Sequence, residues 1–265
     1  MEQESIIRVV DLVTYYGERR ILNRVNLEIR AGETMVILGG SGTGKSTLLR
    51  HIIRLETPTS GHVFIKSHDV CHMSEERFNL LRRKIGMLFQ GGALFNSMTI
   101  EENVALPLRE LTQLEDSTIR IMTRIKLDLV GLSGFENYLP AELSGGMRKR
   151  AALARAMAMD PEILLFDEPS AGLDPITAAG IDSLIVKLRA AFNMTIVVVT
   201  HEMSSAFAIA DRVTMMHEGE VIAVGTPEEI RSNSNPRVQQ FLNRVPEEET
   251  RDMQAYLRTL TQPPA

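Results

Sequence analysis

Hydrophobic and polar positions alternate along the first part of the chain. Residues 6–37 contain the runs IIRVVDLV, ILNRVNLEI and TMVIL, separated by the turn-like segments YGERR and GE. Alternation of this kind is typical of strands with one buried face. TMVIL leads into a glycine-rich segment, and the following STLLRHIIRL has its apolar residues at helical spacing. We therefore predict several N-terminal strands and a helix that begins just after the glycines.

Through much of the remaining chain, short apolar runs alternate with segments whose apolar residues recur at helical spacing. Strands are predicted at HVFIKSHDV, GMLFQ, EILLFDEP and TIVVVTHE, and helices at SEERFNLLRRKI, AAGIDSLIVKLRAAF and EMSSAFAIA. VTMMHEGEVIAVG has the pattern of a hairpin that turns at EG. Strands that alternate with helices indicate an α/β protein with a largely parallel core sheet.

The segment from residue 91 to about residue 156 differs from its surroundings. Glycine breaks give way to three helix-compatible stretches, TIEENVALPLRE, DSTIRIMTRIKLDLVGL and MRKRAALARAMAM. We interpret this segment as a helical insertion in the α/β core. After Asn235 the helix-like PRVQQFLNRV leads into a polar end.

Composition narrows the class of protein. Of 265 residues, 44% are hydrophobic and 24% charged, and the net charge is −5, which disfavours a general nucleic-acid binder. The single Cys71 excludes a disulfide within the chain. We expect no signal peptide, because the N-terminus is acidic and lacks an apolar core, and no apolar run approaches the ~20 residues of a membrane span.

A phosphate-binding loop is the strongest chemical signal. Residues 39–46 read GGSGTGKS, which fits G-x-x-x-x-G-K-[ST] between a predicted strand and a predicted helix. In this motif backbone amides surround the phosphates, the lysine reaches the β- and γ-phosphates, and the serine hydroxyl binds Mg²⁺. The predicted ATP-binding residues here are Gly39, Gly40, Ser41, Gly42, Thr43, Gly44, Lys45, Ser46 and Thr47.

Two adjacent carboxylates end the apolar run ILLFDEP. Asp167 is suited to hold Mg²⁺ directly or through water. Glu168 is suited to polarise a water for in-line attack on the γ-phosphate. Because an acidic turn after a core strand is common on its own, the interpretation depends on the phosphate-binding loop.

With these motifs the chain resembles the nucleotide-binding subunit of ABC transporters over roughly residues 6–230. LSGGM at 143–147 is similar to the LSGGQ signature of that family, and SAGLD at 170–174 to its D-loop. The resemblance implies a P-loop NTPase core with an N-terminal antiparallel β subdomain and an inserted α-helical subdomain. The implied domain spans residues 1–235, with helices at about 91–156, followed by a tail, 236–265, that contacts a neighbouring subunit.

The resemblance also implies roles for single residues. Gln90 would bind Mg²⁺ or the attacking water, His201 would contact the γ-phosphate and fix Glu168, and Tyr16 would stack on adenine, with Tyr15 as a competitor. A second copy of the chain would face this site with its own signature and D-loop residues, namely Ser144, Gly145, Gly146 and Asp174. The basic run Arg148–Arg150 either adds to the field at the phosphate or is simply solvated.

A finer resemblance, to the ATPases of MCE-type lipid transporters, lies in 89–110, in LSGGMRKRAALARA and in DEPSAGLDPIT. It implies a peripheral protein on the cytoplasmic face of the inner membrane of a Gram-negative bacterium. The implied partners are a permease pair, a periplasmic MCE ring and a small STAS-domain subunit, and the implied cargo is phospholipid. We expect an apolar docking groove for the permease at Phe95, Met98, Val104 and Leu106.

Three other classes of protein share part of this pattern. An ATPase of another ABC importer or exporter would share the motifs at 143–174. A soluble ABC-type ATPase acting on DNA or ribosomes would usually carry coiled coils, zinc modules or two cassettes, and the sequence has none of these signatures. A small-molecule P-loop kinase would lack LSGG and the histidine at 201.

Overall fold

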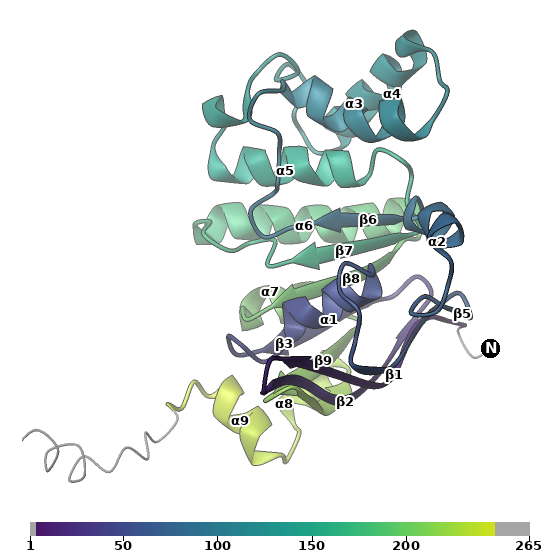
Figure 1. Ribbon diagram of the computed structural model, residues 1–265. Helices are drawn as coiled ribbons and strands as arrows, with labels where there is room; N and C mark the ends of the chain where they lie inside the picture. Colours follow the sequence, from purple (N-terminus) through teal and green to yellow (C-terminus); the bar gives the residue numbers. More distant parts are fainter. Residues whose placement is uncertain (1–3, 247–265) are drawn as a thin grey trace, which may run out of the picture.

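Two β-sheets organise the chain, and the computed structural model describes residues 4–246 of it (Figure 1). The first sheet is antiparallel, has the order β2-β1-β4-β5, and consists of β1 (Ser5–Tyr16), β2 (Arg19–Arg30), β4 (Ser60–Ile65) and β5 (His68–Asp69). The second has the order β10-β9-β3-β8-β7-β6 and consists of β3 (Thr34–Gly39), β6 (Ile85–Leu88), β7 (Ile163–Asp167), β8 (Thr195–Thr200), β9 (Arg212–His217) and β10 (Glu220–Gly225).

The central strands of the second sheet are parallel and buried on both faces. Every residue of β3, β7 and β8 is buried, which explains why these strands are continuous apolar runs rather than alternating ones. Their successive side chains point to opposite faces. Leu38, Phe166 and Val198 join one hydrophobic core, whereas Ile37 and Leu165 join the other.

The helices cover both faces of this sheet. α1 (Lys45–Ile52) and α2 (Glu75–Arg82) contribute to the core shared with the antiparallel sheet, and α6 (Pro175–Phe192) and α7 (Met203–Ile209) to the other core. In Figure 1, α3 (Ile100–Leu111) and α4 (Asp116–Leu129) form the outermost layer and α5 (Gly145–Ala156) lies beneath them. A 3₁₀ turn at Pro140–Glu142 precedes α5, and α8 (Pro227–Arg231) and α9 (Pro236–Leu242) end the described chain.

The register of the parallel strands aligns three loops at one sheet edge. Leu38 of β3 lies opposite Thr200 of β8, and Asp167 of β7 lies opposite Val199 of β8. The residues that follow β3, β7 and β8 therefore meet at the carboxyl ends of the strands, which is where ligands bind in open α/β sheets.

The predicted fold class is confirmed, with two local corrections. Helix α8 was missed, although Thr226 and Glu229 form a capping box that sequence inspection could have found. Val104 is fully buried in the main core, so it is not available to a permease groove, while Phe95 is exposed. Within residues 4–246, no helix combines the length and apolarity needed to cross a membrane.

Helix α9 belongs to the packing of the domain itself. Val238 is completely buried in the core that also holds β9 and α7, and Phe241 and Leu242 pack against that core. Residues 236–242 therefore pack on the domain core, and the domain boundary at residue 235 stays a prediction. The contact of 236–265 with a neighbouring subunit stays a prediction, and 247–265 lie outside the described residues.

We expect Val238→Ala to lower the free energy of unfolding by about 2 kcal/mol, from the lost methyl groups and the small cavity they leave. Val245→Ala is the matched control, because Val245 is exposed, and should change stability by less than about 0.5 kcal/mol. Urea unfolding followed by circular dichroism measures both. Equal effects of the two substitutions would contradict the packing of α9 on the core.

Candidate active site

The phosphate-binding loop connects β3 to α1. At two of its positions, neighbouring residues lie so close that only glycine fits. A Cβ at Gly39 would collide with the carbonyl oxygen of Met216, and one at Gly44 would lie 2.6 Å from Leu22 Cδ2. Gly44 also has a φ of +94°, a conformation that favours glycine. The loop is thus pressed against β2 and β9, with no room for side chains at these two positions.

Lys45 is buried at the first turn of α1. Its Nζ donates hydrogen bonds to the carbonyl oxygens of Gly39 (3.0 Å) and Gly40 (2.7 Å) of the same loop. Burial lowers the pKa of Lys45, while the carboxylates of Glu168 and Asp167 act in the opposite direction. A cation partly stripped of water and surrounded by backbone dipoles is suited to bind an anionic phosphate.

Two side chains with oxygen atoms that could bind a metal ion lie next to each other beside the loop. The Ser46 hydroxyl donates to Asp167 Oδ1 over 2.8 Å, which brings the start of α1 to the end of β7. A hydroxyl and a carboxylate oxygen fit Mg²⁺, which takes few protein ligands and completes its shell with waters and phosphates. Gln90, the third predicted magnesium ligand, has an exposed side chain two residues after β6.

Glu168 is held in a strained and enclosed position. Its φ is +49°, which is uncommon outside glycine, and only 10% of its side chain is exposed. His201 Nδ1 lies 2.9 Å from Oε1, and the Thr200 hydroxyl donates to Oε2 over 3.3 Å. Both contacts come from the end of β8, so the two strand ends fix the carboxylate that we expect to orient the attacking water.

Lys149 is a residue whose role the sequence analysis missed. It lies on α5 but is buried, and its Nζ donates to the carbonyl oxygens of Gln90 and of Glu168, the latter over 3.2 Å. Burial lowers the pKa of Lys149, and Asp167 and Glu168 oppose this effect. This lysine therefore joins the helical layer to both the loop after β6 and the strained glutamate.

The other two residues of the basic run are also engaged rather than freely solvated. Arg148 Nη1 donates to the Leu143 carbonyl over 2.6 Å, and Arg150 Nη1 donates to the Val130 carbonyl over 3.1 Å. Both bonds hold chain segments around α5, so these two arginines are not simply solvated, and a contribution of the run to the field at the phosphate stays a prediction.

Of the two tyrosines at the end of β1, Tyr16 is tied to the phosphate-binding segment. Its hydroxyl bonds to the Glu56 carboxylate and lies 3.5 Å from Thr47 Oγ1, while the residue is 46% exposed. Tyr15 is also exposed, and the contact that ties it to another segment is made by its backbone N–H, which donates to Thr59 Oγ1. The geometry favours Tyr16 as the residue beside a nucleotide, and its stacking on adenine stays a prediction.

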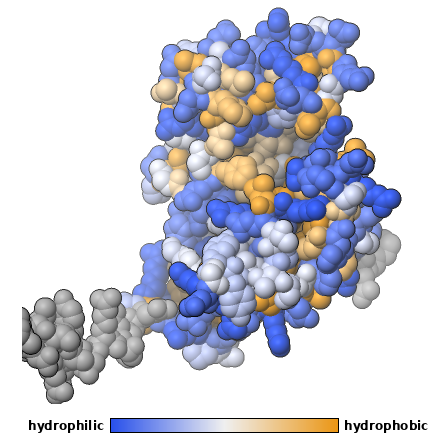
Figure 2. Space-filling model, in the orientation of Figure 1, coloured by the Kyte–Doolittle hydropathy of each residue, from blue (hydrophilic) through white to orange (hydrophobic). Residues whose placement is uncertain are grey.

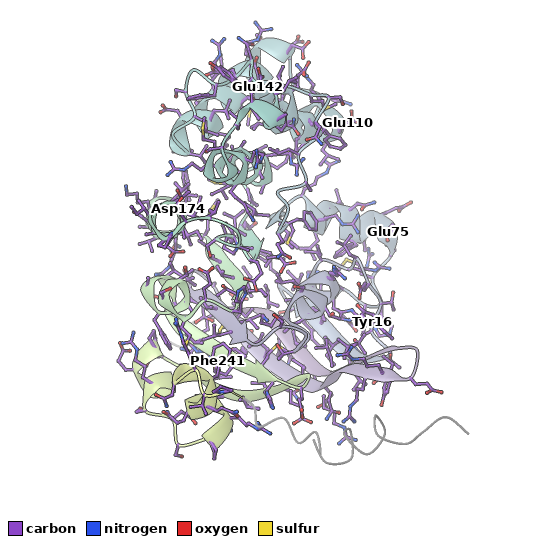
Figure 3. All side chains as sticks on the ribbon, turned by 90° about the vertical axis from the view of Figure 1, so that its left-hand side faces the viewer. Tyr16, Glu75, Glu110, Glu142, Asp174 and Phe241 are labelled. Carbon is purple, nitrogen blue, oxygen red and sulfur yellow. The ribbon has the colours of Figure 1, made fainter. Side chains whose placement is uncertain are left out.

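The signature and D-loop residues cap helices. Ser144 Oγ accepts the Met147 N–H at the start of α5, and Asp174 Oδ1 accepts the N–H groups of Ile176 and Thr177 at the start of α6. Gly146 packs against Thr177, whose methyl group a Cβ would strike. In Figure 3, Asp174 and Glu142, which lies just before the signature, are separated from Tyr16. The part of the chain just before the signature thus lies away from the tyrosine that contacts the phosphate-binding segment.

A core sheet with this loop, two carboxylates and a histidine at one edge, plus a separate helical layer, defines an ATP-binding cassette. The sequence profile of the ABC transporter family matches residues 22–171, so the chain belongs to this family. It is 42% identical, over 90% of each chain, to the intermembrane phospholipid transport system ATP-binding protein MlaF of Haemophilus influenzae. The resemblance to this group of ATPases is thereby confirmed.

Two further comparisons are informative. A probable ribonucleotide transport ATP-binding protein, mkl, of Mycobacterium leprae is 44% identical over 89% of this chain and 68% of its own. The solved dimeric structure of the ATP-binding cassette MJ0796, in a post-hydrolysis state with ADP and Pi, has a TM-score of 0.77. It is 34% identical and covers 83% of this chain and 98% of its own. The chain is thus an ATP-hydrolysing subunit of an ABC transporter.

We expect Lys149→Met to lower kcat for ATP hydrolysis by about 10–100-fold, since hydrogen bonds to a charged group are worth about 1.5–3 kcal/mol each. Nucleotide affinity should change little, because the Lys149 ammonium group bonds the carbonyls of Gln90 and Glu168 and not the phosphate-binding loop. Lys149→Arg keeps the charge and is the matched control. Steady-state hydrolysis and nucleotide titration give the two quantities, and an unchanged kcat would refute the positioning role.

Proposed function

We propose that two copies of the chain associate head to tail and enclose two ATP molecules, each bound by the loop of one copy and the signature of the other. The observation that carries this proposal is the placement of Ser144 at the N-terminus of α5, two residues after Glu142, which lies away from Tyr16 in Figure 3. A helix N-terminus with a serine cap and two glycines is suited to meet a γ-phosphate. The solved cassette MJ0796 is dimeric with ADP and Pi, which supports the association of two copies.

An exposed apolar residue lies beside the signature and D-loop residues. Ile176, two residues after the D-loop residue Asp174, is 86% exposed, and Gly145 and Gly146 lie on the adjoining start of α5. A single exposed apolar side chain is ordinary on a protein surface, so the case for this surface rests on the helix N-terminus and glycines beside it. A second copy would cover Ile176 while it completes the phosphate site with Ser144, Gly145, Gly146 and Asp174.

The proposed reaction is in-line hydrolysis of the γ-phosphate. Lys45 and the loop amides bind the phosphates, and Ser46, Asp167 and Gln90 would hold Mg²⁺, which neutralises developing charge when it is bound. Glu168 accepts a proton from the attacking water as the water oxygen bonds to the γ-phosphorus, and ADP leaves with the electrons of the broken P–O bond. His201 holds the carboxylate and contacts the γ-phosphate.

Glu168→Gln should trap the ATP-bound dimer, because the amide preserves the shape of the side chain but cannot accept the proton. We expect hydrolysis to fall at least about 100-fold, in line with the usual contribution of a general base. Light scattering after gel filtration should show a dimer of this variant with ATP and a monomer with ADP. Near-normal turnover would contradict the role of Glu168, and a monomer with ATP would contradict the dimer.

For the transported substrate we propose phospholipid, moved between the inner and outer membranes to maintain outer-membrane lipid asymmetry. The 42% identity with MlaF and the resemblance of residues 89–110 support this assignment. The proposed partners are an MlaE-like permease, an MlaD-like MCE protein and an MlaB-like STAS-domain subunit. The chain would lie peripherally on the cytoplasmic face of the inner membrane of a Gram-negative bacterium.

The helical layer offers a surface for the permease. On the face seen in Figure 2, apolar residues interrupt the polar surface over this layer. The exposed large apolar side chains of this region are Phe95, Leu111, Leu114, Ile121, Ile125, Tyr138 and Leu139. Exposed apolar residues gathered in one part of a protein are typical of interaction sites, so we place the permease contact here, with Phe95 in place of the buried Val104.

A second candidate substrate follows from the mycobacterial relative, whose name describes probable ribonucleotide transport. The same ATPase cycle would then serve a different permease, and the motifs of the chain would be unchanged. The partner proteins and the bound cargo distinguish the two candidates.

Affinity purification of the full chain from detergent-solubilised membranes of its host tests the lipid assignment. We expect a permease and a membrane-anchored MCE protein to co-purify, with phospholipid in the complex. A permease accompanied by a solute-binding protein and no MCE protein would refute it. Phe95→Asp should reduce recovery of the permease. The control is Leu80→Asp, which changes an exposed apolar residue on α2, outside the helical layer, and should leave recovery unchanged.

A further inference from the structure

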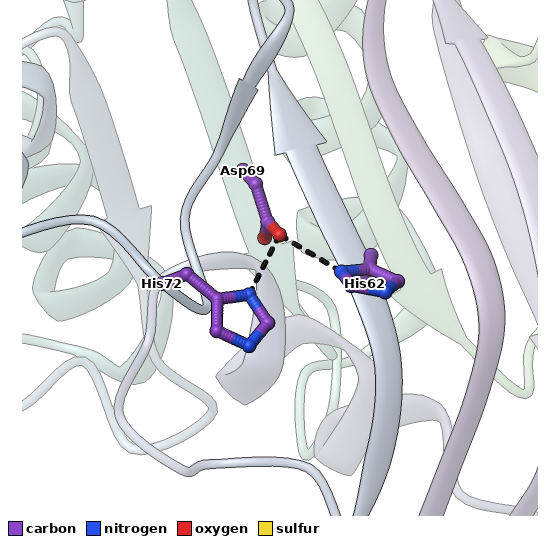
Figure 4. Close-up of side chains that lie close together, drawn as sticks. All are labelled: His62, Asp69 and His72. Atoms are coloured by element: carbon purple, nitrogen blue, oxygen red, sulfur yellow. Dashed lines mark hydrogen bonds and ion pairs between the residues drawn. The ribbon is translucent and has the colours of Figure 1, made fainter.

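Two imidazoles converge on one carboxylate on the antiparallel sheet, outside the ATP site. His62 Nδ1 lies 2.8 Å and His72 Nδ1 lies 2.7 Å from the same oxygen, Oδ2 of Asp69 (Figure 4). The ligand atoms of the three residues all lie within 4.8 Å of one another. Neither ATP binding nor the proposed transport function uses this cluster.

The sheet register produces this convergence. Phe64 of β4 lies opposite Asp69 of β5, so Asp69 is a diagonal neighbour of His62, two residues before Phe64 on the same strand face. His72 follows three residues after Asp69 in the segment that leads to α2. Three potential ligands are therefore brought together by backbone pairing and one short loop.

The carboxylate is oriented by a separate contact. Its other oxygen, Oδ1, accepts the backbone N–H of Cys71 over 3.0 Å, which leaves Oδ2 directed at the two imidazoles. Hydrogen bonds of this kind, which fix a ligating carboxylate from behind, are typical of metal sites. The nearby Cys71 packs against the apolar core and is not part of the cluster.

We propose that His62, Asp69 and His72 form a binding site for a divalent first-row transition-metal ion such as Zn²⁺. Imidazole and carboxylate are ligands that Zn²⁺, Ni²⁺ and Cu²⁺ accept, whereas Mg²⁺ and Ca²⁺ prefer oxygen ligands alone. Three protein ligands leave at least one position for water, because the cluster is open to solvent. Each histidine would bind through Nδ1 and carry its proton on Nε2.

Metal binding requires a small rearrangement of ligand atoms that now lie within 4.8 Å of one another. Zn–N and Zn–O distances of about 2.0–2.2 Å place tetrahedral ligands about 3.3 Å apart, so each Nδ1 must move roughly half an ångström from Oδ2. The side chains of His62 and His72 are 48% and 69% exposed, so no packed neighbour opposes this shift on their solvent side. Bound metal would then join β4, β5 and the segment before α2.

Zinc titration of the full, tag-free chain against a chromogenic chelator, with Mg²⁺ in excess and no nucleotide, tests the proposal. We expect one site per chain whose affinity falls by at least about 10–100-fold in His62→Ala, His72→Ala and Asp69→Asn. His68→Ala is the matched control, because His68 lies in the same hairpin with its Nδ1 2.8 Å from the Lys66 carbonyl, outside the cluster. It should bind Zn²⁺ as the wild type does.

A second readout keeps the test independent of damage to the fold. Zn²⁺ should raise the Tm of the wild type and of His68→Ala, and should leave the Tm of His72→Gln unchanged, a mild substitution at the most exposed ligand. Co²⁺ bound in place of Zn²⁺ should give visible d–d absorption that the same variants lose. Binding weaker than about 1 mM in the wild type, or equal binding in His62→Ala and His68→Ala, would overturn the proposal.

Discussion

Parallel pairing of β3, β8 and β7 is the constraint on which the site depends. Its register sets Leu38 beside Thr200 and Asp167 beside Val199, so the segments after all three strands emerge at the same height. The Ser46–Asp167 and His201–Glu168 contacts follow from that alignment, since each joins groups that lie at the same edge of the sheet. Complete burial of these strands makes slippage costly, because a shift of one residue would exchange the two hydrophobic cores.

Lys149 adds a link between this edge and the helical layer. A buried ammonium group that bonds the carbonyl of Glu168 makes the backbone at the strained glutamate sensitive to the position of α5. The carbonyl of Gln90 is bound by the same group, so the loop after β6 would move with α5 as well. Movement of the helical layer against the core would therefore reach the hydrolytic carboxylate through one side chain, which is a physical basis for coupling ATP hydrolysis to a membrane partner.

The residues of the chemical motifs could be predicted from the sequence, whereas the burial of individual side chains could not. The glycine-rich loop and the carboxylates at 167 and 168 have local patterns with a stated chemical purpose, so they could be found one motif at a time. Lys149 could not, because a lysine on a helix next to two arginines has the pattern of a solvated face, and its burial arises only from tertiary packing. Val104 was misplaced for the related reason that apolar spacing does not say which neighbour covers a side chain.

The central claim is that each phosphate site combines the loop of one chain with the signature of another, and cross-linking tests it most directly. Two variants that lack Cys71 are prepared, one carrying Ser41→Cys in the loop and the other Ser144→Cys in the signature. Mixed in the presence of ATP and a short thiol cross-linker, they should give a product of twice the chain mass, which neither variant gives alone. No such product in the mixture, or equal yields from each variant alone, would contradict the head-to-tail arrangement.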